Sequence, residues 1–315
     1  MPALSDRTAD LTSFKVMDVL EAAAQLERAG CHVVHLEVGQ PDFPTPPVIL
    51  EAGIRALRDG ATGYTHSLGH PELREAVCRH YGGRYGVEVS PDQVIVTSGT
   101  SPAMLLVFSA LCNPGDEIVL SDPHYACYPN FVRYVGARPV TFDLLESDGY
   151  RPRVERIRAV LGPRTKGIVV NSPANPTGVV VAADDLRAIA ELGPFVISDE
   201  IYHALNYGSE RERSILEFTD RAFVLNGFSK RYAMPGWRLG YVIAPEDFVP
   251  AMQVMQQNFF ICAADFVQHA GIAALRYAWP DVERMAAAYD QRRRAILSRP
   301  RQLGFRIGYE PTGAF

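Results

Sequence analysis

The sequence lacks the features of a membrane, secreted or nucleic-acid-binding protein. No apolar run reaches the roughly 18 residues of a membrane-spanning helix. Residues 1–10 carry Ser5, Asp6 and Asp10 where a secretory signal would need an apolar core. The formal net charge is −5, which does not favour a broad surface for nucleic acid. We therefore expect neither a membrane nor a nucleic acid as a partner.

The sequence is also poor in cysteine and in metal-binding motifs. Its five cysteines are an odd number, widely scattered and without a CxxC pair, so we expect neither a disulfide framework nor structural zinc. This usage fits a reducing cytoplasm, where we place the protein. The pairs His32/His35 and His66/His70 have spacings that suit a metal, but no carboxylate or thiol completes either set. We assign these histidines to surface or packing positions and predict no metal site.

Short apolar runs alternate with helical patterns along the 315 residues, of which 47% are hydrophobic. This alternation is typical of an α/β domain with a mainly parallel sheet. Runs bounded by Gly, Pro, Asn and Asp predict buried strands at 94–97, 117–121, 167–171, 195–199, 223–226 and 239–244. Periodic segments predict helices at 102–111, 154–161, 183–192, 248–277 and 282–303, and residues 305–309 resemble a further strand.

Three segments that follow predicted strands carry polar groups suited to binding. At 97–102, hydroxyls, free amides and a helix start with Ser101 as N-cap can hold an anion, although the segment taken alone favours a simple capped helix. At 171–178, two prolines and a glycine restrain the backbone that carries Asn175. Asp199 ends an apolar strand, where α/β sheets bind ligands; an N-cap role is the structural alternative.

The segment 227–240 contains the strongest candidate for a nucleophile. Lys230 lies among Phe228, Tyr232, Met234 and Trp237, whereas a lysine between apolar strands is ordinarily a solvated surface residue. An apolar environment lowers the pKa of an ammonium group and suits a Schiff-base nucleophile. Arg238, eight residues later, offers a forked donor set to a phosphate.

Together these segments resemble the class I/II aminotransferases, pyridoxal-phosphate enzymes of the aspartate aminotransferase fold (fold type I). The resemblance runs from about Phe14 to the end of the chain. Its motifs, in family order, are GQPDFPTP at 39–46, GYT at 63–65, SGTS at 98–101, DPHYACYP at 122–129, NSPANPTG at 171–178, DEIY at 199–202 and GFSKRYAMPGWRLG at 227–240. Any one of these motifs could occur by chance, but seven in order indicate the family.

The resemblance implies a three-layer α/β/α large domain with a mainly parallel sheet and a smaller α+β domain built from both chain ends. On this basis we expect an N-terminal arm with part of the small domain at 1–45. The large domain that binds pyridoxal phosphate should span 46–282, and an incomplete start of the C-terminal small domain should span 283–315.

The resemblance also implies roles for the matched residues. Lys230 forms the Schiff base with pyridoxal phosphate and moves the substrate Cα proton, and Asp199 keeps the pyridine nitrogen protonated. Tyr202, with Asn175, hydrogen-bonds the ring oxygen, and Tyr125 stacks on the ring. Thr100 and Ser101, with Arg238 and the helix N-terminus, hold the cofactor phosphate, and Tyr64 reaches the phosphate of the cofactor in a partner subunit. Gly99 and Ser229 are further cofactor contacts. Gly39 contacts the substrate carboxylate, and Asn175 is a second substrate contact.

The activity implied is transfer of an amino group from an L-amino acid to a 2-oxo acid, in a homodimer with shared active sites. The segment 311–315 matches the PxGAF motif, after which members of the family continue. The arginine that clamps the substrate carboxylate lies in that later part. We therefore expect a chain ending at Phe315 to bind the cofactor poorly or to turn over slowly.

Two alternatives to an aminotransferase are compatible with parts of the sequence. A pyridoxal-phosphate lyase, synthase or decarboxylase would share the fold and the cofactor motifs, because fold and cofactor do not determine the reaction. A non-catalytic ligand-sensing domain would need a DNA-binding segment, for which the short N-terminus has no room, and it would not need Lys230 and Asp199 together.

Overall fold

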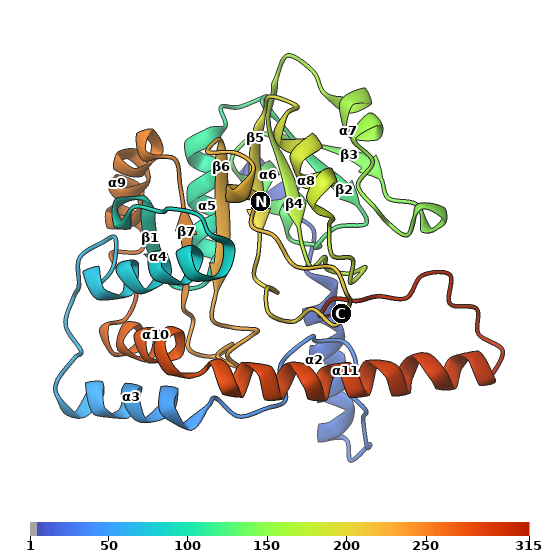
Figure 1. Cartoon of the computed structure of the whole chain (residues 1–315), viewed down its shortest axis with the longest axis horizontal. Helices are drawn as coiled ribbons and strands as arrows, with labels where there is room; N and C mark the ends of the chain where they lie inside the picture. The colour runs from blue at the N-terminus through green and yellow to red at the C-terminus, as the bar shows by residue number, and fades with distance from the viewer. Residues whose placement is uncertain (1–4, 315) are drawn as a thin grey trace.

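A seven-stranded sheet forms the centre of the molecule, whose computed structural model describes residues 5–314 (Figure 1). The strand order is β1-β7-β6-β5-β4-β2-β3. Strand β7 is antiparallel to β1 and β6, and the remaining neighbours are parallel. The strands are β1 (Val94–Thr97), β2 (Glu117–Asp122), β3 (Arg138–Asp143), β4 (Thr165–Asn171), β5 (Phe195–Asp199), β6 (Ala222–Gly227) and β7 (Gly240–Ile243).

Helices cover both faces of this sheet and produce the predicted three-layer α/β/α arrangement (Figure 1). Successive strand residues point to opposite faces, so Val119 packs into one core while Ile118 and Leu120 pack into the other. One core includes side chains of α4, α7, α8 and α10, and the second includes side chains of α5, α6 and α9. This burial on both faces explains why the strands are continuous apolar runs.

The α-helices and 3₁₀ turns have the following bounds. The helices are α1 (Asp6–Ala9), α2 (Lys15–Arg28), α3 (Pro47–Arg58), α4 (Pro71–Tyr85), α5 (Thr100–Leu111), α6 (Tyr128–Tyr134), α7 (Val154–Val160), α8 (Ala183–Ala190), α9 (Val249–Phe259), α10 (Asp265–Tyr277) and α11 (Trp279–Gln302). The 3₁₀ turns are η1 (Pro91–Gln93), η2 (Glu146–Asp148), η3 (Ile215–Glu217) and η4 (Glu246–Phe248).

Six predicted strands are confirmed, and β3 was not predicted. Strand β3 lies at the sheet edge, and most of its side chains are partly or fully exposed, so its sequence lacks the apolar run of a central strand. The strand expected at 305–309 is wrong: these residues are irregular. A strand needs a neighbouring strand to pair with. In this part of the chain the β-type pairing is instead a single bridge between Gly313 and Asn206.

Two helix predictions also need correction. The helix expected at 248–277 is two helices, α9 and α10, because the chain turns at Ile261, whose φ of +65° is left-handed. Helix α5 starts at Thr100, and its N-cap is Gly99 rather than Ser101. Gly99 has a φ of +96°, which a glycine adopts without strain.

Segments from both ends of the chain contact each other below the sheet. Helix α11 runs along the lower edge of the molecule in Figure 1. Its Arg292 pairs with Asp42 at 2.8 Å, and the rings of Tyr289 and Phe43 meet at 5.3 Å. The division into parts at 45 and 282 stays a prediction. Within the described residues, no helix is long and apolar enough to cross a membrane.

A buried carboxylate, Glu200, connects three elements behind the sheet edge. One of its oxygens accepts hydrogen bonds from Ser198, Ser214 and the Ile215 amide at 2.9–3.1 Å. The other oxygen accepts one from Tyr81 of α4 at 3.0 Å. Because Glu200 is fully buried, these donors replace its hydration.

We expect Glu200→Ala to lower the free energy of unfolding by about 3 kcal/mol, because it leaves several buried donors unsatisfied. Glu200→Gln, which keeps one oxygen for the three-donor cluster, should cost roughly half as much. Urea unfolding followed by circular dichroism measures both. Glu51→Ala, on the exposed side of α3, is the matched control. Equal stabilities for all three variants would contradict the role of Glu200.

Candidate active site

Several strands end at one edge of the sheet and bring separate motifs together. Strands β4, β5 and β6 are parallel neighbours, and Asn171 pairs in register with Asp199. Strand β6 ends at Gly227, and the chain returns to the same edge at Gly240, which also pairs with Thr97 of β1. The segments after these strands therefore meet, although they lie far apart in the sequence.

A cleft of about 460 Å³ lies at this edge. It is lined by most of the predicted site residues: Gly39, Thr100, Ser101, Tyr125, Asn175, Asp199, Tyr202, Ser229, Lys230 and Arg238. Gly99 does not line the cleft but lies directly behind Arg238. Tyr64 also lies outside it, with 84% of its surface exposed. Sequence motifs separated by nearly 200 residues thus share one cavity.

The amine of Lys230 lies within this cleft. Its Nζ donates to the Gly39 carbonyl at 2.7 Å and lies 5.8 Å from the centre of the Tyr202 ring. Burial lowers the pKa of Lys230; the carboxylate of Asp199 raises it and Arg238 lowers it further. The net lowering increases the fraction of neutral amine at a given pH, which a nucleophile or base requires.

The carboxyl group of Asp199 is buried at the floor of the cleft, with 3% of the residue exposed. Burial raises its pKa to about 6, even though it accepts hydrogen bonds from the Tyr128 hydroxyl at 2.7 Å and the Ile201 amide at 3.2 Å. A buried carboxylate is stabilised by a nearby cation. The group is therefore suited to bind a positively charged ligand atom.

A chain of hydrogen bonds orients Asn175 and Tyr202. The Asn171 side chain donates to the Asp199 carbonyl at 2.9 Å and accepts from the Asn175 amide at 2.6 Å. The Asn175 side chain donates to the Tyr202 hydroxyl at 3.2 Å. This chain joins the ends of β4 and β5 and directs two polar groups toward one point beside Asp199.

A positively charged corner lies at the start of α5. Gly99 is the N-cap of α5, and Thr100 and Ser101 begin its first turn, where backbone N–H groups have no partner within the helix. Arg238 lies against them in a left-handed backbone conformation, with φ of +54°. A Cβ on Gly99 would come within 2.6 Å of the Arg238 Nη2 atom and would displace this guanidinium, and the φ of +96° at Gly99 disfavours any other residue. Amides, hydroxyls and a guanidinium can together bind a phosphate.

Sequence reasoning assigned no role to Tyr128 and Asn171, although both lie inside quoted motifs. Tyr128 lies at the start of α6, three residues after Tyr125, and donates to Asp199. Asn171 is the last residue of β4. The position of a polar residue at a strand end was the signal for Asn171, whereas only the packing of α6 against the sheet reveals Tyr128. Glu37 and His124 also line the cleft.

Comparisons with known proteins agree with this geometry. Residues 32–315 match the family "Aminotransferase class I and II". A "(5-formylfuran-3-yl)methyl phosphate transaminase" of Methanocaldococcus jannaschii is 39% identical over 99% of this chain and 83% of its own length. An "Aspartate aminotransferase" of Geobacillus stearothermophilus is 35% identical over 99% of this chain and 81% of its own length.

A solved structure shares the fold closely. The aspartate aminotransferase of Thermus thermophilus with maleate superimposes with a TM-score of 0.96 at 36% identity, covering all of this chain and 84% of that one. The predicted fold and family are thus confirmed. The chain belongs to the class I and II aminotransferases and is a pyridoxal-phosphate-dependent enzyme that transfers amino groups between amino acids and 2-oxo acids.

Proposed function

We propose that transamination in this protein takes place in the 460 Å³ cleft and depends on Lys230. The observation that carries this proposal is that a lysine of lowered pKa, a buried carboxylate and an anion-binding corner line one cavity. Bound pyridoxal phosphate supplies an aldehyde for the lysine and a ring that takes up electrons from the substrate Cα. The residues of the chain then bind, orient and move protons.

The residues of the cleft fit this cofactor at three places. Asp199 offers a buried carboxylate to a protonated ring nitrogen. Burial raises the pKa of this carboxylate, and a positively charged nitrogen beside it would stabilise the ionised form. Asn175 and Tyr202 offer hydrogen-bond donors for the ring oxygen, and Tyr125 offers a flat ring for stacking. At the third place, Thr100, Ser101 and Arg238 are proposed to hold the phosphate, with Ser229 and Gly99, which lies behind Arg238, as further cofactor contacts.

Lys230 is proposed to bond the cofactor aldehyde and, once released, to take the Cα proton at Nζ and return it. Burial keeps a fraction of this amine neutral, as both steps require. Gly39, whose carbonyl accepts from Lys230, is proposed to contact the substrate carboxylate through its backbone together with Asn175.

A homodimer is the proposed assembly. Tyr64 is a large aromatic residue with 84% of its surface exposed, which suits a contact with the partner's cofactor phosphate. Several apolar side chains near the N-terminus, such as Met17, Leu26 and Leu36, are also at least half exposed. We further propose a cytoplasmic location, because the five cysteines are all free thiols. Neither nucleic acid nor membrane is proposed as a partner.

An amino-transfer assay tests the reaction class. The purified protein with pyridoxal phosphate is incubated with an L-amino acid and 2-oxoglutarate or pyruvate. Formation of the new amino acid supports the proposal. Release of ammonia or carbon dioxide without amino transfer would instead indicate a lyase or a decarboxylase.

Replacement of Lys230 should remove covalent cofactor binding. The chain has three lysines, Lys15, Lys166 and Lys230, so borohydride reduction followed by peptide mass mapping assigns the attachment site directly. We expect the modification on Lys230 alone. Lys230→Ala should lose the visible absorbance of the bound cofactor and at least about 10³-fold in amino transfer. Lys166→Ala is the control, and attachment to Lys166 would overturn the assignment.

Asp199 should make the stability of the cofactor-free protein depend on pH. Its pKa is about 6 when folded and about 4 when unfolded, so the native state holds this proton over a range in which the unfolded state loses it. As the pH rises from 4 to 6, the free energy of unfolding of the wild type should therefore fall relative to that of Asp199→Asn, by up to about 3 kcal/mol. Urea unfolding at several pH values measures this difference. Parallel pH profiles for the two proteins would contradict it.

Gly99→Ala should weaken cofactor binding by roughly 10-fold or more, because its Cβ would meet Arg238 at 2.6 Å and its φ of +96° disfavours alanine. A spectroscopic titration with pyridoxal phosphate measures the Kd. Gly236→Ala is the matched control in the neighbouring loop, since its Cβ would meet nothing within 4 Å. Equal Kd values for the two variants would contradict the proposed phosphate corner.

A further inference from the structure

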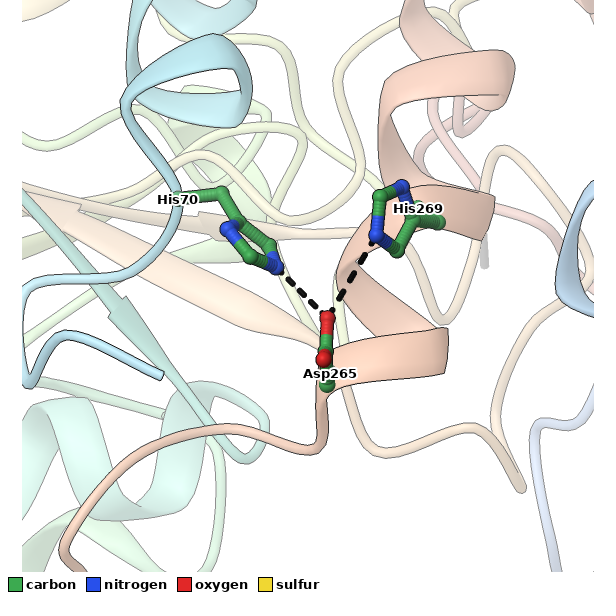
Figure 2. A group of neighbouring side chains, drawn as sticks. All are labelled: His70, Asp265 and His269. Carbon is green, nitrogen blue, oxygen red and sulfur yellow. Dashed lines mark hydrogen bonds and ion pairs between the residues drawn. The ribbon is translucent and has the colours of Figure 1, made fainter. Parts of the chain in front are cut away.

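Three metal-ligating side chains meet at the junction of α4 and α10, away from the cleft. Figure 2 shows the rings of His70 and His269 directed toward the carboxylate of Asp265. The Nε2 atoms of His70 and His269 lie 2.6 and 3.4 Å from the same oxygen of Asp265. All the candidate ligand atoms lie within 4.8 Å of one another. Sequence reasoning had paired His70 with His66 and predicted no metal, because Asp265 is 195 residues away.

The backbone holds these side chains in place. Asp265 and His269 are four residues apart in α10 and therefore lie on the same face of that helix. His70 is the N-cap residue of α4, and its amide donates to the buried Gln268 side chain at 2.7 Å. Each ligand therefore comes from a helix or a helix terminus, which makes a binding site precise.

We infer that His70, Asp265 and His269 bind a divalent transition-metal ion of the zinc type. Two imidazoles and one carboxylate are a donor set that zinc prefers, and they leave a fourth position for water. With Zn–N and Zn–O bonds near 2.1 Å, the ligands of a tetrahedral ion lie about 3.4 Å apart. The separation of His269 from Asp265 already has this value. His70 would move away from Asp265 by less than about 1 Å, and the two ring nitrogens, which lie within 4.8 Å of each other, would take up the same spacing around the ion.

The surroundings allow an ion to reach this site. The side chains of His70, Asp265 and His269 are 28%, 16% and 44% exposed. His269 also lines a groove together with residues of α3 and the segment after it, among them Arg55 and Asp59, so one side of the cluster faces this groove. The Asp265 carboxylate neutralises one of the two charges of the ion, and the partial exposure of the three side chains leaves the remaining charge in contact with solvent.

The ion would fasten the segment that leads to Tyr64. Thr65, in the segment before His70, already contacts α10 and the loop before it. The Thr65 amide donates to the Cys262 sulfur at 3.4 Å, and Gln268 of α10 donates to the Thr65 hydroxyl at 2.9 Å. A metal bridge between α4 and α10 adds a stronger connection at the end of this segment. Binding to the folded state alone then raises thermal stability with increasing metal concentration.

Isothermal titration of the holoenzyme with zinc chloride tests the site. We expect one ion per chain and an increase in Tm, with no change in the visible absorbance of the cofactor. His269→Asn, a surface change that preserves the fold, should weaken zinc binding at least about tenfold, as should Asp265→Asn. His32→Asn removes an exposed histidine elsewhere and is the matched control.

Cobalt(II) provides a second readout that does not depend on activity. The wild-type holoenzyme and His32→Asn should develop the visible d–d bands of a tetrahedral cobalt site, and His269→Asn should not. Zinc affinities that are equal in wild type and His269→Asn, or tetrahedral cobalt bands that persist in this variant, would overturn the inference. Absence of zinc binding to the wild type would overturn it as well.

Discussion

The burial of the Asp199 carboxylate at the end of β5 is the constraint on which the arrangement of the cleft depends. A carboxyl group with 3% exposure is costly to ionise, and its neighbours are placed to reduce that cost. Tyr128 and the Ile201 amide donate to it, and its charge raises the pKa of Lys230 against the lowering by burial. These hydrogen bonds do not fully offset the cost of burying the negative charge, because the pKa of Asp199 is still raised to about 6. A cationic ring atom would provide that charge, which is the basis of its proposed role.

The parallel sheet makes this arrangement possible, because neighbouring parallel strands end at the same edge. Asn171 and Asp199 lie side by side in register, and the loop from Gly227 to Gly240 brings Lys230 and Arg238 to the same place. Close packing completes the corner: a Cβ on Gly240 would lie 2.7 Å from the backbone of Gly99, and one on Gly99 would displace Arg238. Gly99 and Gly240 thus allow the segments around them and Arg238 to approach closely, which the proposed phosphate site requires.

Two polar networks attach α4 to other parts of the molecule, one next to the cleft and one away from it. Glu200, adjacent to Asp199, fastens the end of β5 to α4 through Tyr81. On another side of α4, His70 and Asp265 connect its start to α10. Helix α4 is therefore attached by two carboxylates. Glu200, which is buried and adjacent to Asp199, binds Tyr81 of α4, and Asp265, which is partly buried and a proposed metal ligand, binds His70 at the start of α4. The same helix follows the segment that carries Tyr64, so the stability of this helix bears on the proposed contact with a partner subunit.

The sequence by itself determined the alternation of strands and helices, because strands buried on both faces must be apolar runs. It also identified the motifs that contain Lys230, Asp199 and Asn175, because these segments place polar or ionisable side chains at or just after the ends of apolar strands. Edge strand β3 was missed, since its exposed residues carry no such pattern. Only the tertiary structure decided that α5 begins at Thr100 with Gly99 as its N-cap, that Tyr128 donates to Asp199, and that His70 meets Asp265 and His269. These contacts depend on how segments far apart in the sequence pack together, and the spacing of residues along the chain does not determine which of them become neighbours in space.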